Sequence, residues 1–205
     1  MNVSPTQRKM GKTGIIILAA GNSTRLGQPK QLLLYKGITL IEHIVSEAKQ
    51  ANLYPVIVIT GFYREEIAAV LDKYEVYTLF NENWREGMAS SIVKGISKLS
   101  SFRQIEDVII SVCDQPCISS GLFRKLIEAK EKSGKEIIAS AYSDTLGTPV
   151  LFGKNYFPAL RLLTGHQGAK KILELDNSDV GSVMFEEGRF DIDTIEDYNK
   201  LVSRT

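Results

Sequence analysis

Short apolar runs alternate along the chain with segments whose apolar residues recur at helical spacing. The apolar runs predict strands at Gly14–Ala20, Pro55–Thr60, Glu75–Phe80, Asp107–Cys113, Glu136–Tyr142, Thr148–Phe152, Val180–Glu187 and Arg189–Ile192. The amphipathic segments predict helices at Thr39–Asn52, Tyr63–Lys73, Met88–Leu99, Ser119–Ser133, Tyr156–Leu163, Gly168–Leu175 and Thr194–Ser203. Because strands that alternate with helices form crossover units, we predict an α/β fold. Its architecture is a single-domain, three-layer α/β/α, Rossmann-like one with a mostly parallel, mixed sheet.

Length and charge narrow the classes of protein to consider. A chain of 205 residues suits one domain, and we expect a disordered tail at residues 1–13 followed by that domain at residues 14–205. The longest apolar runs, Ile15–Ala20 and Pro55–Ile59, fall far short of the roughly 20 residues that a membrane span needs. Lys and Arg number 25 against 24 for Asp and Glu, so the net charge is +1. Bulk charge therefore gives no reason to expect a nucleic-acid or membrane partner.

The two cysteines, Cys113 and Cys117, lie close together in the sequence. A structural zinc site needs a full set of nitrogen or sulfur ligands, and no second Cys or His pair is present to complete one. We interpret the pair as reduced thiols at the end of a buried strand. Reduced thiols, together with the lack of a secretory signal, indicate a cytoplasmic protein.

The segment that follows the first predicted strand carries the first candidate chemistry. Small residues at Ala19, Ala20 and Gly21 let a ligand approach the backbone closely, and Arg25 and Lys30 follow them. Backbone N–H groups and two cations suit a nucleotide polyphosphate. Neither the Gly-x-Gly-x-x-Gly pattern nor a P-loop is present. A tight turn followed by a solvated basic loop is the alternative interpretation.

Five motifs occur in order along the chain. The first, Leu18–Lys30, reads Leu-Ala-Ala-Gly-Asn-Ser-Thr-Arg-Leu-Gly-Gln-Pro-Lys, and the others are Asn81–Ser91, Cys113–Pro116, Gly147–Phe152 and Asp191–Asp197. Together they resemble the motifs of the nucleotidyltransferases related to the molybdenum cofactor enzymes, the MobA-like family, in its cytidylyltransferase branch. The departures are Leu26 for Met and Ile195 for Pro. The resemblance covers residues 14–203 and implies the nucleotidyltransferase fold.

The resemblance also implies a set of site residues. It places nucleotide binding on Leu18, Ala19, Ala20, Gly21, Asn22, Ser23, Arg25, Lys30, Asn81, Gly87, Met88, Ser90 and Ser91. It assigns catalytic roles to Arg25, Lys30 and Asp114. It assigns Mg²⁺ binding to Asp114 and Asp191. Since Asp191 and Asp193 are two apart on a predicted strand, we expect only one of them to reach the metal. We assign Asp193 to capping the helix that begins at Thr194.

The acceptor side departs from the family pattern. Gly165–Lys170 stands where the family shows Gly-Asp-x-Gly-Ala-Arg, so His166 replaces an acid and Lys170 replaces Arg. The implied acceptor-binding residues are Thr148, Pro149, His166, Gly168 and Lys170. A polar loop position with no substrate contact is an equal interpretation of His166. The other histidine, His43, lies inside a predicted helix and is interpreted as packing.

The implied reaction is in-line attack by the phosphomonoester of an acceptor on the α-phosphorus of a nucleoside triphosphate, with release of pyrophosphate. A phosphomonoester is mostly a dianion at neutral pH, so a dedicated general base is not required. Leu-Ala-Ala-Gly, in place of the Leu-Ala-Gly-Gly of guanylyl-transferring relatives, favours CTP over GTP. The implied acceptor is molybdopterin, and a molybdoenzyme or its chaperone is a further implied partner.

Two other functions stay open. Pro29-Lys30-Gln31 and Ile41-Glu42-His43 resemble cytidylyltransferases that act on a sugar or polyol phosphate. The gap between the arginine and Pro-Lys-Gln is longer in those enzymes, and they lack the Gly-Met-x-x-Ser stretch. A non-catalytic nucleotide-binding accessory protein for a molybdoenzyme is the second alternative.

Overall fold

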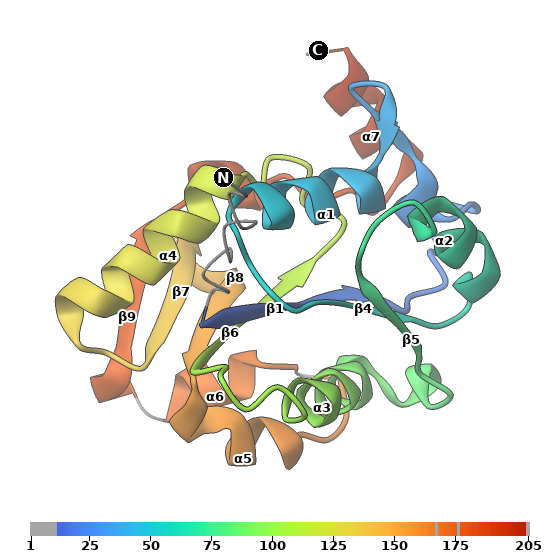
Figure 1. The fold of residues 1–205 in the computed structure, drawn as a ribbon. Coiled ribbons are helices and arrows are strands. Elements are labelled where there is room, and N and C mark those ends of the chain that lie inside the picture. The colour runs from blue at the N-terminus through green and yellow to red at the C-terminus, as the bar shows by residue number, and fades with distance from the viewer. Residues whose placement is uncertain (1–11, 167, 176, 204–205) are drawn as a thin grey trace, which may run out of the picture.

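The computed structural model describes residues 12–166, 168–175 and 177–203. Its central element is a seven-stranded sheet in the order β5-β4-β1-β6-β8-β7-β9 (Figure 1). The strands are β1 (Thr13–Ala19), β4 (Val56–Thr60), β5 (Tyr77–Phe80), β6 (Asp107–Val112), β7 (Ile137–Tyr142), β8 (Thr145–Gly153) and β9 (Val180–Met184). Only β8 runs antiparallel to its neighbours, β6 and β7. The predicted single-domain α/β fold with a mostly parallel, mixed sheet is confirmed.

Helices cover both faces of this sheet (Figure 1). One face carries α1 (Leu40–Gln50), α2 (Arg64–Leu71) and α4 (Ser120–Ser133). The other carries α3 (Met88–Leu99), α5 (Phe157–Arg161) and α6 (Lys170–Leu175). The last helix, α7 (Ile195–Val202), packs beside the small hairpin of β2 (Leu34–Tyr35) and β3 (Ile38–Thr39). None of the described helices is long and apolar enough to cross a membrane.

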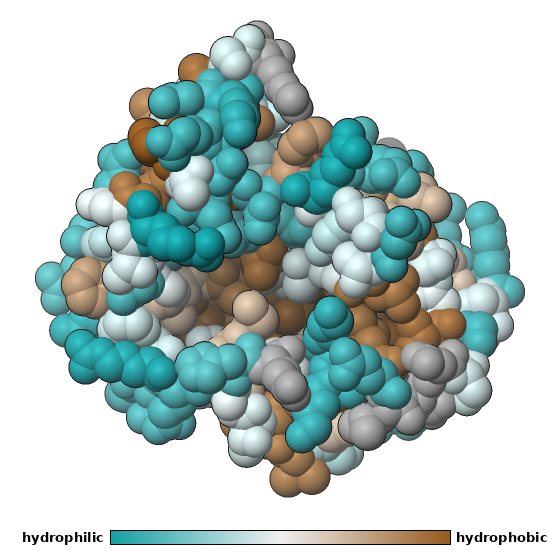
Figure 2. All heavy atoms as spheres, turned by 180° about the vertical axis from the view of Figure 1, so that it is seen from behind, coloured by the Kyte–Doolittle hydropathy of each residue, from teal (hydrophilic) through white to brown (hydrophobic). Residues whose placement is uncertain are grey.

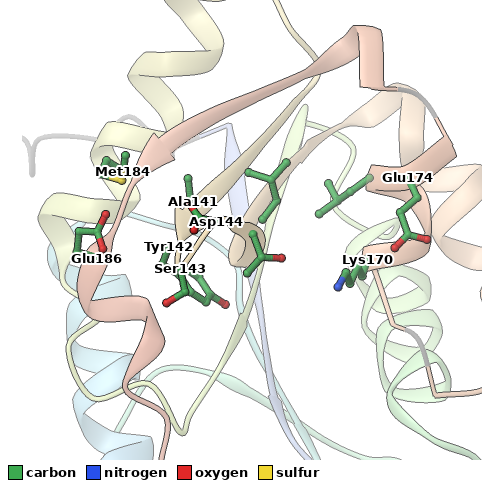
Figure 3. A pocket seen from close by; sticks show the side chains of 11 residues that line it. Ala141, Tyr142, Ser143, Asp144, Lys170, Glu174, Met184 and Glu186 are labelled. Atoms are coloured by element: carbon green, nitrogen blue, oxygen red, sulfur yellow. The ribbon is translucent and has the colours of Figure 1, made fainter.

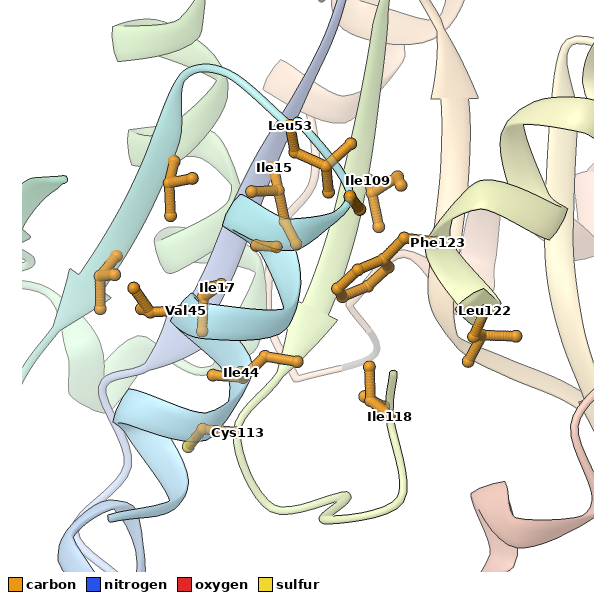
Figure 4. Close-up of a cluster of buried hydrophobic side chains, with 14 of the residues drawn as sticks. Ile15, Ile17, Ile44, Val45, Leu53, Ile109, Cys113, Ile118, Leu122 and Phe123 are labelled. Carbon is orange, nitrogen blue, oxygen red and sulfur yellow. The ribbon is translucent and has the colours of Figure 1, made fainter. Parts of the chain in front are cut away.

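The core explains why β1 reads as a continuous apolar run. Ile15 and Ile17 point to the cluster under α1 and α4, where Val45 and Phe123 meet them (Figure 4). Ile16 points to the opposite face, against α3. A Cβ added at Gly95 of α3 would lie 2.7 Å from Ile16 Cγ2, so α3 approaches β1 more closely than any other residue type would allow. The N-terminus of α3 is thereby fixed beside the end of β1.

The structure differs from the predicted elements in several places. The strand β1 starts at Thr13, which is buried, and the rest of the predicted tail, residues 1–11, lies outside the described residues. The strand β8 begins at Thr145, not at Thr148, because the chain already turns at Ser143 and Asp144, which both adopt positive φ. Residues 186–189 form a 3-10 helix, so the strand predicted at Arg189–Ile192 is absent from this described segment. The β2–β3 hairpin, turned at Lys36 and Gly37, was not predicted.

The surface on the far side of the view in Figure 1 is hollowed near its middle. Figure 2 shows apolar residues at the bottom of this hollow and hydrophilic residues around it. Parallel strands of an open α/β sheet end at one edge, and ligands of such sheets bind beyond that edge. The loops that follow β1, β5 and β6 are therefore the ones to inspect.

Candidate functional site

Three of the predicted charged residues meet where β1 and β6 end. Lys30 Nζ donates to Asp114 Oδ2 at 2.6 Å, and also to Asp193 Oδ1 at 3.2 Å. Arg25 Nη2 donates to Asp193 Oδ2 at 2.7 Å. Because β1 and β6 pair in parallel, the residues that follow them share one edge of the sheet. The structure therefore brings together Arg25, Lys30 and Asp114, which lie far apart in the sequence.

Burial and the neighbouring carboxylates have opposite effects on the pKa of Lys30. Burial alone lowers the pKa of Lys30, but the carboxylates of Asp114 and Asp193 outweigh it and raise the pKa above the ordinary lysine value. Lys30 therefore stays protonated at neutral pH. Burial raises the pKa of the neighbouring Cys113 thiol to about 12, and the charge of Asp114 adds to this effect. This thiol is thus an un-ionised, buried group and not a nucleophile.

A cavity of about 250 Å³ opens beside the cluster. Its lining contains nine of the predicted site residues: Leu18, Ala19, Ala20, Gly21, Lys30, Gly87, Met88, Ser91 and Asp114. The predicted residues Asn22, Ser23, Arg25, Asn81 and Ser90 are outside the lining. Gln31, Trp84, Val112 and Cys113 also line it and were not predicted. Trp84 could have been found, because it is the one tryptophan of the sequence and lies within the second motif.

Gln31 supports the loop between β1 and Lys30 from below. Its side chain is 1% exposed, and its Nε2 donates to the carbonyls of Ala19 at 3.1 Å and Gly21 at 2.9 Å. A second support comes from Ser23, whose Oγ accepts the backbone N–H of Lys30 at 3.2 Å. Gln31 is a polar residue whose burial depends on the tertiary fold, so hydrophobic patterning gave no signal for its role.

Asn81 organises the loop on the other side of the cavity. Its Nδ2 donates to Ser90 Oγ at 2.8 Å and to Ser91 Oγ at 2.9 Å, while its Oδ1 accepts the N–H of Asn83 at 3.1 Å. Both amide hydrogens are thus used within the protein. Asn81 and Ser90 therefore hold the loop that carries Trp84 and Gly87, and the structure does not place them against the cavity.

Gly87 occupies a position that only glycine fits. Its φ is +107°, and an added Cβ would lie 2.6 Å from the carbonyl oxygen of Gly165 and 2.8 Å from His166 Nδ1. Ala89 N also donates to that carbonyl, at 3.3 Å. The Gly165–His166 loop therefore rests on the N-terminus of α3, beside the cavity that Gly87 and Met88 line.

The predicted role of Asp193 as a helix cap is wrong. Thr194 is the N-cap of α7, and it forms a capping box with Asp197. Asp193 instead binds the two cations of the cluster. The N–H of Ile192 donates to the carbonyl of Asp114 at 2.9 Å, and this bond holds the segment against the end of β6.

The predicted acceptor residues lie in three places. Thr148 lines a hollow of about 250 Å³ with Asp114 and Asp191, and its Oγ1 donates to Gln115 Oε1 at 3.1 Å. Pro149 is buried behind it. His166 lies at Gly87, and an added Cβ at Gly168 would lie 2.7 Å from Met88 Sδ. Lys170 faces a separate hollow of about 420 Å³ together with Asp144, Glu174 and Glu186 (Figure 3).

The hollow lined by Thr148 and the hollow lined by Lys170 share one wall. Tyr142 lines both the hollow of Thr148 and the hollow of Lys170. Asp114 in turn lines both the hollow of Thr148 and the cavity beside the charged cluster. The three spaces thus form a row along the edge of the sheet, with Asp114 between the first two.

The residues of the cluster fit a divalent cation. Asp114 and Asp191 line the same hollow, and the pKa of Asp191 is raised by burial and by the charges of Asp114 and Asp193. This mutual repulsion is what a bound cation relieves. The described residues contain no group of three or more Asp, Glu, His or Cys placed to hold a metal. Magnesium keeps several waters and binds substrate phosphates, so one or two carboxylates are enough.

Comparison with known proteins decides the family. The sequence pattern of the "MobA-like NTP transferase domain" matches residues 15–180. The chain belongs to the MobA-like NTP transferase family. The resemblance of the five motifs to the MobA-like family is thereby confirmed.

Relatives in this family carry several different names. Purine catabolism protein PucB of Bacillus subtilis is 26% identical, over 91% of this chain and 94% of its own length. Nicotine blue oxidoreductase of Paenarthrobacter nicotinovorans is also 26% identical, over 91% of this chain and 95% of its own. The crystal structure of Rv0371c from Mycobacterium tuberculosis is 26% identical, covers 93% of this chain and 97% of its own, and superposes with a TM-score of 0.81. Another structure of Rv0371c, 23% identical with a TM-score of 0.78 and covering 94% of this chain and 99% of its own, is a complex with manganese.

Proposed function

We propose that this member of the MobA-like family transfers CMP from CTP to a phosphomonoester acceptor, with molybdopterin as the favoured acceptor, and releases pyrophosphate. One observation carries the proposal: Lys30 and Asp114 both line the cavity, and Lys30 Nζ donates to Asp114, 84 positions away. In the proposal Lys30 binds the phosphates and Asp114 holds a metal ion, and their hydrogen bond supports these neighbouring roles.

The nucleotide occupies the cavity in this proposal. The backbone of Ala19–Gly21 and the side chain of Met88 border the nucleoside, and Lys30 and Arg25 hold the β- and γ-phosphates. Both cations are paired with Asp193 in the structure, so the phosphates displace that carboxylate when they bind. Preorganised cations aimed at the site of developing charge are the main catalytic device of such transfers.

Asp114 and Asp191 hold the divalent cation, for which Mg²⁺ is the proposed ion. When bound, it offsets charge on the α-phosphate and on the departing pyrophosphate. The manganese complex of Rv0371c supports a divalent cation in this family.

The acceptor enters from the opposite side of Asp114. Its phosphate lies in the hollow of Thr148 and Asp191, and the rest of the molecule extends past Tyr142 into the hollow of Lys170 (Figure 3). His166 and Gly168 border the nucleotide side in this arrangement, because they rest on Gly87 and Met88. The phosphomonoester arrives as a dianion, so the chain has only to position it.

The test is pyrophosphate release with Mg²⁺, with CTP and GTP offered separately, each with and without molybdenum-loaded molybdopterin. The expected result is release from CTP that depends on molybdopterin. Lys30→Ala should lower the rate by about 100-fold or more, while Lys49→Ala, an exposed lysine on α1, should leave it unchanged. Normal activity of Lys30→Ala would remove the phosphate assignment.

The other outcomes separate the alternatives. Release that depends on a sugar or polyol phosphate and not on molybdopterin would favour a cytidylyltransferase that acts on that phosphate. Tight binding of CTP without pyrophosphate release, with Asp114→Ala changing only the affinity for CTP, would favour a non-catalytic nucleotide-binding protein. Release from GTP alone would overturn the choice of CTP.

A further inference from the structure

A hollow at the opposite end of the sheet is lined by cations and apolar side chains. Its volume is about 500 Å³, and it lies between the C-terminal end of α3, the loop that leads to β6, and α5. Arg103, Lys154 and Arg161 supply the cations, while Phe102 and Phe157 supply apolar walls. Figure 1 shows α3 and α5 side by side on this face of the sheet.

The charge of this hollow is unbalanced. No acidic residue is in its lining, and within the described ranges no salt bridge pairs Arg103, Lys154 or Arg161 with a carboxylate. The two acids nearest in sequence already have partners: Glu106 pairs with Lys12 at 2.9 Å, and Asp107 pairs with Lys130 at 3.3 Å. Three positive charges therefore converge on one space with nothing to neutralise them.

The C-terminus of α3 does not account for these cations. Its last carbonyls already have backbone donors, because Ser100 N donates to Ile96 O at 3.1 Å and Phe102 N donates to Leu99 O at 3.0 Å. Arg161 donates to Ser100 Oγ, a side chain, and not to a carbonyl of α3. Within the part of the chain that the structure describes, none of the three cations has a carboxylate partner, so their charge is available to an external anion.

This hollow is separate from the nucleotide cavity. It flanks the start of β6, where Lys154 N donates to the carbonyl of Glu106 at 2.7 Å. Asp114 follows the other end of this six-residue strand, so the two sites are about 20 Å apart along it.

We propose that this hollow binds a small organic phosphate. Arg103, Lys154 and Arg161 bind its phosphate group, since guanidinium groups match phosphate oxygens with paired hydrogen bonds. Phe102 and Phe157 contact the apolar part of the same molecule. A space of this volume falls within the usual range of about 300–1,000 Å³ for small-molecule sites. The apolar walls distinguish such a ligand from bare phosphate.

The probes are phenyl phosphate and inorganic phosphate, titrated into the full ¹⁵N-labelled chain and followed by the shifts of assigned amides. Phenyl phosphate should shift the amides of residues 99–105 and 154–161, and it should bind at least about fivefold more tightly than inorganic phosphate. Shifts confined to residues 18–30 and 87–91, or equal affinities of the two probes, would overturn the proposal.

Two double variants complete the test. Arg103→Gln with Lys154→Gln should weaken phenyl phosphate binding about tenfold or more, because both side chains are exposed and their loss leaves the fold intact. Lys49→Gln with Lys200→Gln removes the same charge from exposed positions on α1 and α7, and it should change affinity less than twofold. An equal loss in both double variants would mean that net charge alone attracts the anion. The urea midpoint of each variant checks that the fold is retained.

Discussion

Replacing Asn81 with alanine tests whether the loop that carries Trp84 and Gly87 is held by the protein or by the ligand. Asn81 is 3% exposed, and its side chain makes three hydrogen bonds, to Ser90, Ser91 and the backbone of Asn83. Each such bond contributes about 1 kcal/mol net, and a buried partner left unpaired costs about 1–3 kcal/mol. Ser90 keeps its bonds to the carbonyls of Asn83 and Gly87, but buried Ser91 loses its donor.

The expected loss of stability is therefore about 2–4 kcal/mol. In a domain of about this size each kcal/mol lowers Tm by roughly 2–4 °C, so Asn81→Ala should melt about 5–15 °C below the parent protein. Urea unfolding measures the free energy, and calorimetric titration with CTP measures the affinity. CTP should bind more weakly, because the loop that carries Trp84 and Gly87 is less ordered.

Ser97→Ala on α3, the helix that carries Ser90 and Ser91, is the matched control. Its Oγ bonds only to the carbonyl of Val93 in an exposed position, so its removal should change stability by less than about 0.5 kcal/mol. If Asn81→Ala kept the parent stability but lost CTP binding, Asn81 would be a direct ligand contact. The reasoning from its saturated hydrogen bonds would then be refuted.

Three further predictions concern charge and space at other positions. Asp193→Asn should raise the affinity for metal-free pyrophosphate in titrations with EDTA, because it removes a carboxylate that competes for Arg25 and Lys30; a lower affinity would mean that Asp193 holds these cations in place for the phosphates. At Glu42, burial opposes ionisation, but hydrogen bonds from Lys73 and Thr39 outweigh it and lower the pKa to about 2. The ionised carboxylate of Glu42 thus contributes to stability above pH 4.5, and this contribution is lost as the pH falls from 4.5 towards 2. Glu42→Gln should reduce the dependence of the urea midpoint on pH over this window. An unchanged dependence on pH would contradict the assignment. Gly87→Ala should weaken CTP binding with little global unfolding, since its Cβ meets the Gly165–His166 loop; equal CTP affinity would show that this loop moves aside freely.

The parts of the fold that were predictable are those governed by local patterning. The apolar runs of β1 and β6 and the bounds of α3 follow from spacing alone. Asp114 was also accessible, because it ends a buried strand. These features depend on residues near one another in the chain.

The features that were missed depend on contacts between distant segments. The partners of Asp193 lie 163 and 168 positions away, so its sequence neighbours indicated only a helix cap. The roles of Gln31 and Tyr142 depend on which carbonyls and hollows the fold brings to them. The hairpin turn at Lys36-Gly37 lacks the Asn-Gly or Asp-Gly signal that would have identified it.

The pairing of Lys30 with Asp193 has a consequence for the order in which the molecule assembles. Joining two groups 163 positions apart closes a very long loop, and such non-local contacts form slowly. The charged cluster can therefore form only once residues 191–193 lie against the end of β6. A ligand that binds across Lys30 and Asp114 binds only the native chain. It therefore stabilises the attachment of residues 191–193 to the end of β6, and the melting temperature rises with the logarithm of ligand concentration above the dissociation constant.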